Sequence, residues 1–503
     1  MTVDAARDAA RSGPPGTTPS APVARTRWMT PLMSGCVVLV VAMVAAINLS
    51  IPKLSASGLH PSSTQMLWIV DAYVLVFGCL LIPAGALGDR FGRKGVLMAG
   101  LGAFAAGCLV SAAAPGVGVL VGGRLFTGLA AALIMPATLS LLLQVTEPAR
   151  RPQAIAAWTA ATGVAGAVGN LGGGAVLQWL PWQALFLAGA AAAIALLALV
   201  AWLSPRGERH PANLDLVGAA LLTAALFALL FGIIEGPEKG WGALPVLGSF
   251  AAACVLLAAF AGYALRAAHP LLDPRLFANA RLRGGVLGVA VAFFGLFALF
   301  FVNAQYLQYA KGYSPLLTGA AIAPLVLGMI ATTRGSIPLS RRFGARPVVG
   351  TGLFTLAAGL FLLSFADAST LYGLYAGALL IMAAGMGLCM PALSVGVMAA
   401  LPPARAGLGS GLNSAAREIG SALGVAVLGT VLAGRFADGL PPALAGHAHS
   451  AGEALSAAGD GGAAVHDQVV TAFTDAMSLG YRTVALVVCV AAVAVVAGFR
   501  EGK

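Results

Sequence analysis

Charged residues inside long apolar stretches are the groups of this chain that could do chemistry, because each could carry a proton or hold a charged ligand. Among those within or at the end of such stretches, we single out Asp71, Arg124, Glu235, Arg417 and Glu418. A charged side chain in a bilayer costs about 2.5–3.5 kcal/mol on insertion scales, so it must face protein or water. A carboxylate removed from water also binds a proton more readily. We therefore interpret all five as candidate proton-coupling residues.

Asp71 lies in the segment LWIVDAYVL, three residues after Trp68, so both side chains share one face of a helix. A carboxylate beside an aromatic ring could accept a proton or bind a lipophilic cation; a structural hydrogen bond is the alternative. Arg124 cannot shed its charge and needs a carboxylate, backbone carbonyls or water. We expect Asp71 to be its partner, exchanged for a proton or substrate, and the alternative is an arginine that pins helix ends through carbonyls.

A polar stripe follows the stretch 406–434 at helical spacing, and it should border a cavity because a bilayer does not solvate it. It consists of Ser410, Ser414, Arg417 and Ser421, flanked by Asn413 and Glu418. Arg417 and Glu418 point about 100° apart on a helix, so they need not pair with each other. Glu418 is a second candidate proton site, and an interhelical structural ion pair is the favoured alternative.

Amide and phenol groups crowd the outer half of the stretch 281–309, namely Asn303, Gln305, Tyr306, Gln308 and Tyr309. Such groups can hold varied amphiphiles without demanding one geometry. Together with Asn48, Trp68, Asp71 and Asn413 they form the predicted substrate cavity. Hydrogen bonding between helices is the alternative. Glu235 ends the stretch 213–235, where an ordinary loop acid is equally compatible with the sequence.

The elements that position these residues are membrane helices. The chain has 503 residues, of which 59% are hydrophobic and 9% charged, too apolar for a protein with a wet surface. A span of about 20 apolar residues crosses a bilayer. We predict fourteen helices, at 32–52, 66–88, 95–114, 117–144, 153–178, 182–203, 213–235, 242–266, 281–309, 315–340, 346–366, 370–398, 406–434 and 477–500.

The net charge of +11 follows the positive-inside rule and does not indicate nucleic-acid binding. With a cytoplasmic N-terminus, most Lys and Arg residues fall on the cytoplasmic side. The basic C-terminal tail then lies on the same side, which requires an even number of helices. We expect a multi-pass protein of a bacterial inner membrane, because the chain is rich in Ala, Gly and Arg, with both termini cytoplasmic.

The predicted organisation has four parts. Residues 1–27 form a disordered cytoplasmic tail, 28–204 a six-helix bundle, 205–280 two extra helices with a cytoplasmic linker, and 281–503 a second six-helix bundle. The second bundle includes an external loop at 435–476, with a short amphipathic helix around 465–473. A weak internal repeat supports the division into two halves. The segment GALGDRFGRKGVLMAG after the second helix resembles IPLSRRFGARPVVGTG after the tenth.

Several motifs resemble those of the major facilitator superfamily, in its fourteen-helix drug:proton antiporter branch. The segment GALGDRFGRK, residues 85–94, is similar to the superfamily loop G-x-L-x-D-R-x-G-R-K, and GGRLFTGLAAALIMPATLS contains the intramembrane Arg124. The segments 306–325 and 405–430 also resemble this branch. The resemblance implies an all-α membrane fold of two six-helix bundles plus two central helices. It also implies a role in proton coupling for Arg124 and an acidic position at Glu235.

Two motifs carry further expectations. The loop residues Gly85, Gly88, Asp89, Arg90, Gly92 and Arg93 form a predicted cytoplasmic gate, in which Asp89 accepts from arginines or caps a helix and the arginines pair across the halves. Topology alone is the alternative. The fifth-helix antiporter motif is similar to the run GVAGAVGNLGGG, with Gly163, Gly166, Gly169, Asn170, Gly173 and Gly174. The chain departs from the family at Asn170, usually Pro, and at Met43, commonly acidic.

The leading hypothesis is proton-coupled efflux of lipophilic drugs or antibiotics by alternating access. The alternative is a dedicated exporter of one metabolite, lipid or self-made antibiotic, and Met43 favours a neutral or anionic substrate for it. A membrane enzyme or a channel is a third class that no nucleophile–base pair supports. No phosphate-binding loop occurs, so we expect no ATP, no other cofactor and no metal. The expected partners are a lipophilic small molecule, protons and membrane lipids, and not nucleic acid. We expect the protein to be a monomer.

Overall fold

The computed structural model describes residues 28–55, 57–59, 61, 63–205, 215–402, 405–441, 454–455 and 463–498. The predicted N-terminal tail lies outside the described residues. The regular structure of the described residues is helical: α3 (Met29–Ser55), α4 (Ser63–Phe91), α5 (Arg93–Ala112), α6 (Val117–Val145), η1 (Pro148–Arg150), α7 (Arg151–Trp179), α8 (Gln183–Leu203), α9 (Leu216–Lys239), α10 (Leu244–Ala264), η2 (Pro274–Ala278), α11 (Ala280–Gln305), η3 (Tyr306–Ala310), α12 (Pro315–Ala320), α13 (Ala323–Phe343), α14 (Ala345–Leu363), α15 (Tyr372–Ala399), α16 (Ala406–Gly439) and α18 (Ala463–Gly498).

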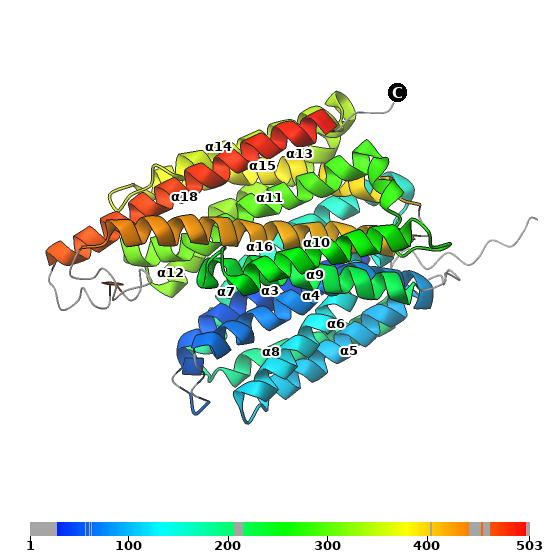
Figure 1. The fold of residues 1–503 in the computed structure, drawn as a ribbon, viewed down its shortest axis with the longest axis horizontal. Helices are drawn as coiled ribbons and strands as arrows, with labels where there is room; N and C mark the ends of the chain where they lie inside the picture. The colour runs from blue at the N-terminus through cyan, green and yellow to red at the C-terminus, as the bar shows by residue number, and fades with distance from the viewer. Residues whose placement is uncertain are drawn as a thin grey trace, which may run out of the picture.

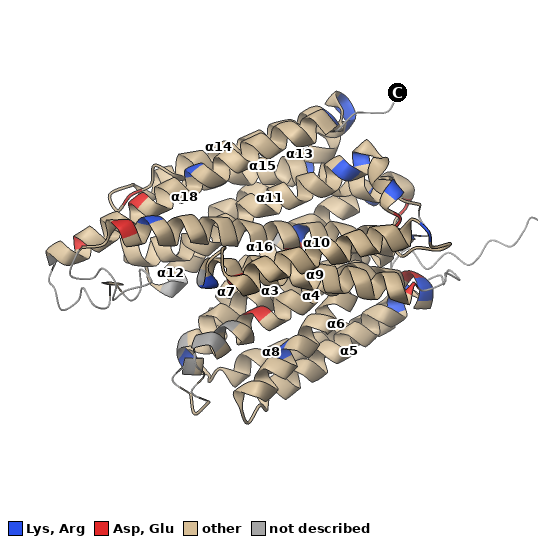
Figure 2. Cartoon of the chain, viewed as in Figure 1, with Lys and Arg blue, Asp and Glu red and all other residues tan. Residues whose placement is uncertain are grey.

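Fourteen helical stretches of the described chain are long and apolar enough to cross a membrane, which confirms the predicted number. The first thirteen begin and end within five residues of their predicted bounds. The helices run roughly parallel, with α3–α8 on one side of the bundle and α11–α18 on the other (Figure 1). Charged residues gather at the two ends, and few interrupt the middle (Figure 2). The arrangement follows from the cost of charge in a bilayer.

Helix occupies both ends of the stretch predicted as the external loop 435–476. Helix α16 continues to Gly439 and α18 already begins at Ala463, so the expected short helix at 465–473 is the first part of α18. Val469, Phe473 and Ala476 on this extension are buried, and Phe473 meets the ring of Tyr309 edge to face. Packing against the neighbouring helices therefore prolongs α18 beyond the stretch that its hydropathy marks as a span.

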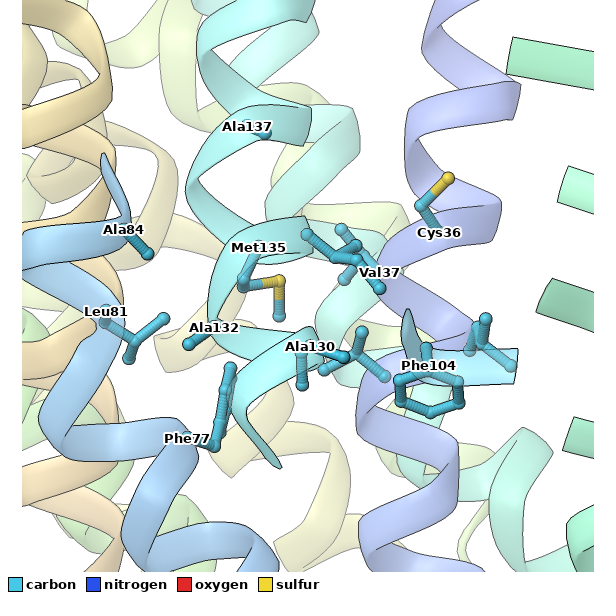
Figure 3. Packing of buried hydrophobic residues seen from close by; sticks show 14 of the residues in the cluster. Cys36, Val37, Phe77, Leu81, Ala84, Phe104, Ala130, Ala132, Met135 and Ala137 are labelled. Carbon is cyan, nitrogen blue, oxygen red and sulfur yellow. The ribbon is translucent and has the colours of Figure 1, made fainter. Parts of the chain in front are cut away.

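The buried apolar side chains form two clusters. The first is built chiefly from α3–α8, and the second from α11 to α18. In the first cluster, small residues of α6 such as Ala130 and Ala132 let larger neighbours such as Phe77 and Phe104 fill the space between helices (Figure 3). Close packing of small residues is how helices associate in a bilayer, where burial of apolar surface gives little driving force.

The helices α9 and α10 lie over the seam between α4 and α16 (Figure 1). Trp68 of α4 meets Phe231 of α9 at 6.4 Å between ring centroids. Just beyond the C-terminal end of α9, the indole of Trp241 donates to the Thr430 hydroxyl of α16 at 2.9 Å. The extra helix pair thus contacts both halves of the molecule.

The pair α3 and α7 depends on two glycines of the fifth-helix motif. A Cβ on Gly169 would lie 2.4 Å from the carbonyl oxygen of Ala42, and one on Gly173 would lie 2.8 Å from Cβ of Ala46. Both distances are too short for a side chain. The prediction that this face is smooth for close packing is therefore met at these two positions.

We expect Gly169→Val to lower the melting temperature of the purified protein, because overpacking of this kind costs about 1–3 kcal/mol. Gly172→Val is the matched control on the same helix, since a Cβ there would meet nothing within 4 Å. Thermal unfolding in detergent, followed by fluorescence-detected size exclusion, measures the effect. Equal melting temperatures for the two variants would contradict the close approach of α3 and α7.

Candidate functional site

The carboxylate of Asp89, near the end of α4, caps the first turn of α16. The N–H of Gly407 donates to Oδ1 at 3.0 Å, and the N–H of Leu408 donates to Oδ2 at 3.1 Å. The first amides of a helix have no partner within it, and its dipole favours a negative charge at that end. Asp89 is only 6% exposed, so water does not screen this contact strongly. The predicted capping role of Asp89 therefore matches the structure, and it joins the two halves.

Arg93 holds this carboxylate in place. Its Nε and Nη2 donate to Asp89 Oδ1 at 3.2 and 3.1 Å, while Nη1 donates to the Ser140 carbonyl of α6 at 3.3 Å. The side chain of Arg90 lies over the ring of Phe91, 5.5 Å from its centroid. We expected arginines to pair across the halves. In these contacts Asp89 connects the two halves, and Arg93 connects Asp89 to α6.

Glycines allow the backbones to meet at this end. A Cβ on Gly85 would lie 2.2 Å from the carbonyl oxygen of Gly407, and one on Gly411 would lie 2.5 Å from that of Leu81. Gly92 has a φ of 97°, in the left-handed region that favours glycine. A Cβ on Gly88 would meet nothing within 4 Å, so space alone does not require glycine there.

The loop of the second half that was predicted to repeat residues 85–94 has a similar geometry. Gly344, between α13 and α14, has a φ of 87°, and Arg342 lies over the ring of Phe343 at 5.3 Å. These features repeat those of Gly92 and Arg90. The position that corresponds to Asp89 is occupied by Arg341, which donates to the Ala149 carbonyl at 3.4 Å, just before α7. The acidic cap is therefore a feature of the first half.

Arg124 of α6 is 1% exposed and bonds to backbone carbonyls of α4. Its Nε donates to the Ile69 oxygen at 2.9 Å, and its Nη2 donates to the Val70 oxygen at 3.3 Å. Asp71 is the next residue of α4, half-buried and within electrostatic reach of the guanidinium. The carbonyl contacts match the alternative interpretation of Arg124. Its exchange with Asp71 stays a prediction.

The ring of Tyr73 completes the surroundings of Arg124, whose guanidinium lies 4.5 Å from the ring centroid. The Tyr73 hydroxyl donates to the Val40 carbonyl of α3 at 3.0 Å. Sequence reasoning missed Tyr73, although it stands one helical turn after Ile69. It also missed Gly407, for which the glycines directly after Arg405 were an available signal.

Arg417 and Glu418 pair with each other, which their positions on the helix left open. Arg417 Nε lies 3.1 Å from Glu418 Oε1, and the two side chains are 3% and 12% exposed. Long side chains bend toward each other even when their Cα–Cβ bonds diverge. The guanidinium also lies 5.5 Å from the ring centroid of Phe293 in α11. The pair is thus within α16 and not between helices.

The amide and phenol groups near the end of α11 are held mainly by protein. The hydroxyl of Tyr375 in α15 donates to Asn303 Oδ1, and the Tyr306 hydroxyl donates to the Asp367 carbonyl at 2.9 Å. Gln305 Nε2 donates to the Phe301 carbonyl at 3.0 Å, one turn back. For these residues the geometry favours the structural alternative. Gln308 and Tyr309 are half-buried, and their place in a cavity stays a prediction.

The other predicted residues lie apart from the Arg124 and Arg417 contacts described above. Asn48 is exposed and donates to the Val44 carbonyl at 3.2 Å. Glu235 pairs with Lys239 at 2.7 Å, one turn along α9. In α7, Gly166 and Gly174 have only loose neighbours at 3.8 Å or more, and Asn170 is half-buried. Gly163 lies in α7, but its side-chain surroundings are outside the described residues.

We expect Asp89→Asn to slow transport roughly tenfold while substrate affinity stays similar, because hydrogen bonds to a charged group contribute about 1.5–3 kcal/mol. The exposed pair of Glu147 and Arg150 supplies the control, Glu147→Gln, which removes an acid without a contact between halves. Initial rates and KM in proteoliposomes distinguish the two effects. An unchanged rate in Asp89→Asn would argue against a gate.

Comparison with known proteins shows which family this chain resembles in sequence and fold. The sequence profile described as Major Facilitator Superfamily matches residues 33–425. The chain is 34% identical to the Tetracenomycin C resistance and export protein of Streptomyces glaucescens, over 84% of this chain and 79% of that one. It is 31% identical to the Multidrug efflux pump LfrA of Mycolicibacterium smegmatis, over 93% and 95%. The fold resembles the human organic anion transporter MFSD10 (TM-score 0.59, 18% identity, 93% and 100% covered).

Proposed function

Because this chain belongs to the Major Facilitator Superfamily, we propose that it exports lipophilic drugs or antibiotics across a bacterial inner membrane, driven by inward flow of protons. The observation that carries the export function is the similarity to a multidrug efflux pump over 93% of the chain. A secondary transporter of this kind uses the proton gradient and needs no cofactor. The working unit is a single chain.

The contacts of Asp89 support alternating access. They join α4 to the start of α16 at the end of the bundle that we assign to the cytoplasm, where most Lys and Arg residues gather (Figure 2). With this end closed, substrate leaves on the outer side. Loss of the two amide contacts frees α16 from α4 and opens the inner side. Both termini then lie in the cytoplasm.

Proton coupling is assigned to Asp71 in the first instance. Asp71 is half-buried, and it directly follows the two residues whose carbonyls accept from Arg124. Protonation of Asp71 would remove a negative charge near a buried arginine. That change biases the packing of α4 against α6, and α4 also carries Asp89. A proton at Asp71 can thereby favour one state of the gate.

A dedicated exporter of one metabolite or self-made antibiotic is the second candidate. Met43 occupies the position where the resembling family commonly carries an acid, and its sulfur lies beside Gly189 of α8. The similarity to a Tetracenomycin C resistance and export protein also favours this role. A panel of unrelated compounds decides between the two: protection against many supports multidrug export, and one accumulating metabolite in a deletion strain supports the narrow role.

We expect Asp71→Asn to abolish dye transport driven by a pH gradient in proteoliposomes, because the amide cannot carry a proton. Ethidium, a cation, and fluorescein, an anion, serve as the two dyes. Asp438→Asn makes the same change at an exposed position of α16 and should leave transport intact.

Undiminished transport in Asp71→Asn would remove Asp71 as the essential coupling site. If the unaltered protein moves neither dye and protects cells against no antibiotic, the export function itself is wrong. A proton-independent rate in the unaltered protein would overturn the coupling alone.

A further inference from the structure

One face of α16 presents buried polar atoms that meet no hydrogen-bond partner in the described part of the chain. They belong to Ser410, Asn413, Ser414 and Arg417. These positions are spaced by three, four and seven residues from the first, so they share a face of the helix. Each side chain is at most 3% exposed. The unpaired atoms are the three oxygens and both Nη atoms of Arg417.

Such a set needs a partner, because buried polar groups in proteins almost always find one. The guanidinium is the strongest case, since it cannot lose its proton and water-free burial of an unpaired charge is costly. Glu418 binds only the Nε edge of Arg417, at 3.1 Å. The two Nη atoms form the outer fork, whose spacing matches the two oxygens of a carboxylate.

The position of this face suits a ligand that moves between the two sides of a membrane. Two glycines of α16 near these residues contact different halves of the molecule. A Cβ on Gly411 would lie 2.5 Å from the Leu81 carbonyl oxygen of α4, in the first half. A Cβ on Gly420 would lie 2.1 Å from the Ala290 carbonyl oxygen of α11, in the second half. The polar atoms therefore lie on the helix that contacts both halves. Sites at such a junction are exposed in turn when the halves move.

An apolar surface accompanies the polar atoms. The ring of Phe293 in α11 lies 5.5 Å from the Arg417 guanidinium. An aromatic wall beside an arginine fork can hold a flat ring system that ends in an acidic oxygen. Water could form hydrogen bonds with the polar atoms, but it would make no favourable apolar contact with the Phe293 ring.

We propose that Ser410, Asn413, Ser414 and Arg417 form a substrate subsite for a carboxylate group on a lipophilic ring system. The Nη atoms of Arg417 donate to the acidic oxygen, and the amide and hydroxyl groups hold neighbouring polar atoms. This inference rests on the proposed export function and narrows its substrates to compounds that carry such a group.

The test compares pyrene-1-carboxylate with pyrene-1-carboxamide, which differ in one charged group. The unaltered protein in detergent should bind the carboxylate at least roughly tenfold more tightly, as expected for charge-assisted hydrogen bonds. Arg417→Gln should remove that preference. Arg435→Gln is the matched control, because it removes an exposed arginine from the same helix and should keep the preference.

Two more variants separate recognition from loss of the ion pair. Arg417→Gln with Glu418→Gln leaves no buried unpaired carboxylate, and it should fold and still lack the preference. Asn413→Ala with Ser414→Ala keeps the pair of Arg417 and Glu418, and it should weaken carboxylate binding severalfold. Melting temperatures in detergent establish that each variant is folded.

The outcomes are distinct from those of the export test. If the unaltered protein shows no preference between the two pyrenes, or if folded Arg417→Gln with Glu418→Gln keeps it, the subsite is wrong and the polar face holds water. Export of ethidium would then still support the proposed function. A preference that depends on Arg417 in a protein that exports no dye or antibiotic would support the subsite and contradict the export function.

Discussion

The rest of the molecule depends on one carboxylate that closes a helix end belonging to the other half. Asp89 accepts two amides of α16 and two N–H groups of Arg93, and Arg93 also reaches α6. The four helices α4, α5, α6 and α16 therefore meet at one buried group. Gly85 and Gly407 make this possible, because neither backbone could approach the other past a Cβ. The charge and the missing side chains act together.

The corresponding loop of the second half has a similar backbone conformation, but it lacks the acidic residue. Gly344 repeats the left-handed turn of Gly92, yet Arg341 stands where an acid would cap α7. A cation gains nothing from the positive end of a helix dipole. The contact between α4 and α16 is thus the stronger of the two, and we expect the contact between α13 and α7 to part more easily.

The fold was largely predictable, because span length and hydropathy depend on the bilayer and not on tertiary contacts. The capping role of Asp89 was predictable as a type, but its partner was not, since Gly407 lies 318 residues away. Whether Arg417 and Glu418 pair was left open, because helical spacing does not show how long side chains bend. The early start of α18 was missed because burial of Val469 and Phe473, rather than hydropathy, extends it.

The most direct measurement of the central claim is the separation of the two halves at the end of the bundle where Asp89 joins them. Spin labels at Glu147 and Arg405, both exposed, report the separation of the halves by electron–electron double resonance in a variant without native cysteines. We predict one short distance in the protein with Asp89 and an added longer population in Asp89→Asn. Identical distance distributions in the two proteins would contradict the claim that this carboxylate holds the halves together.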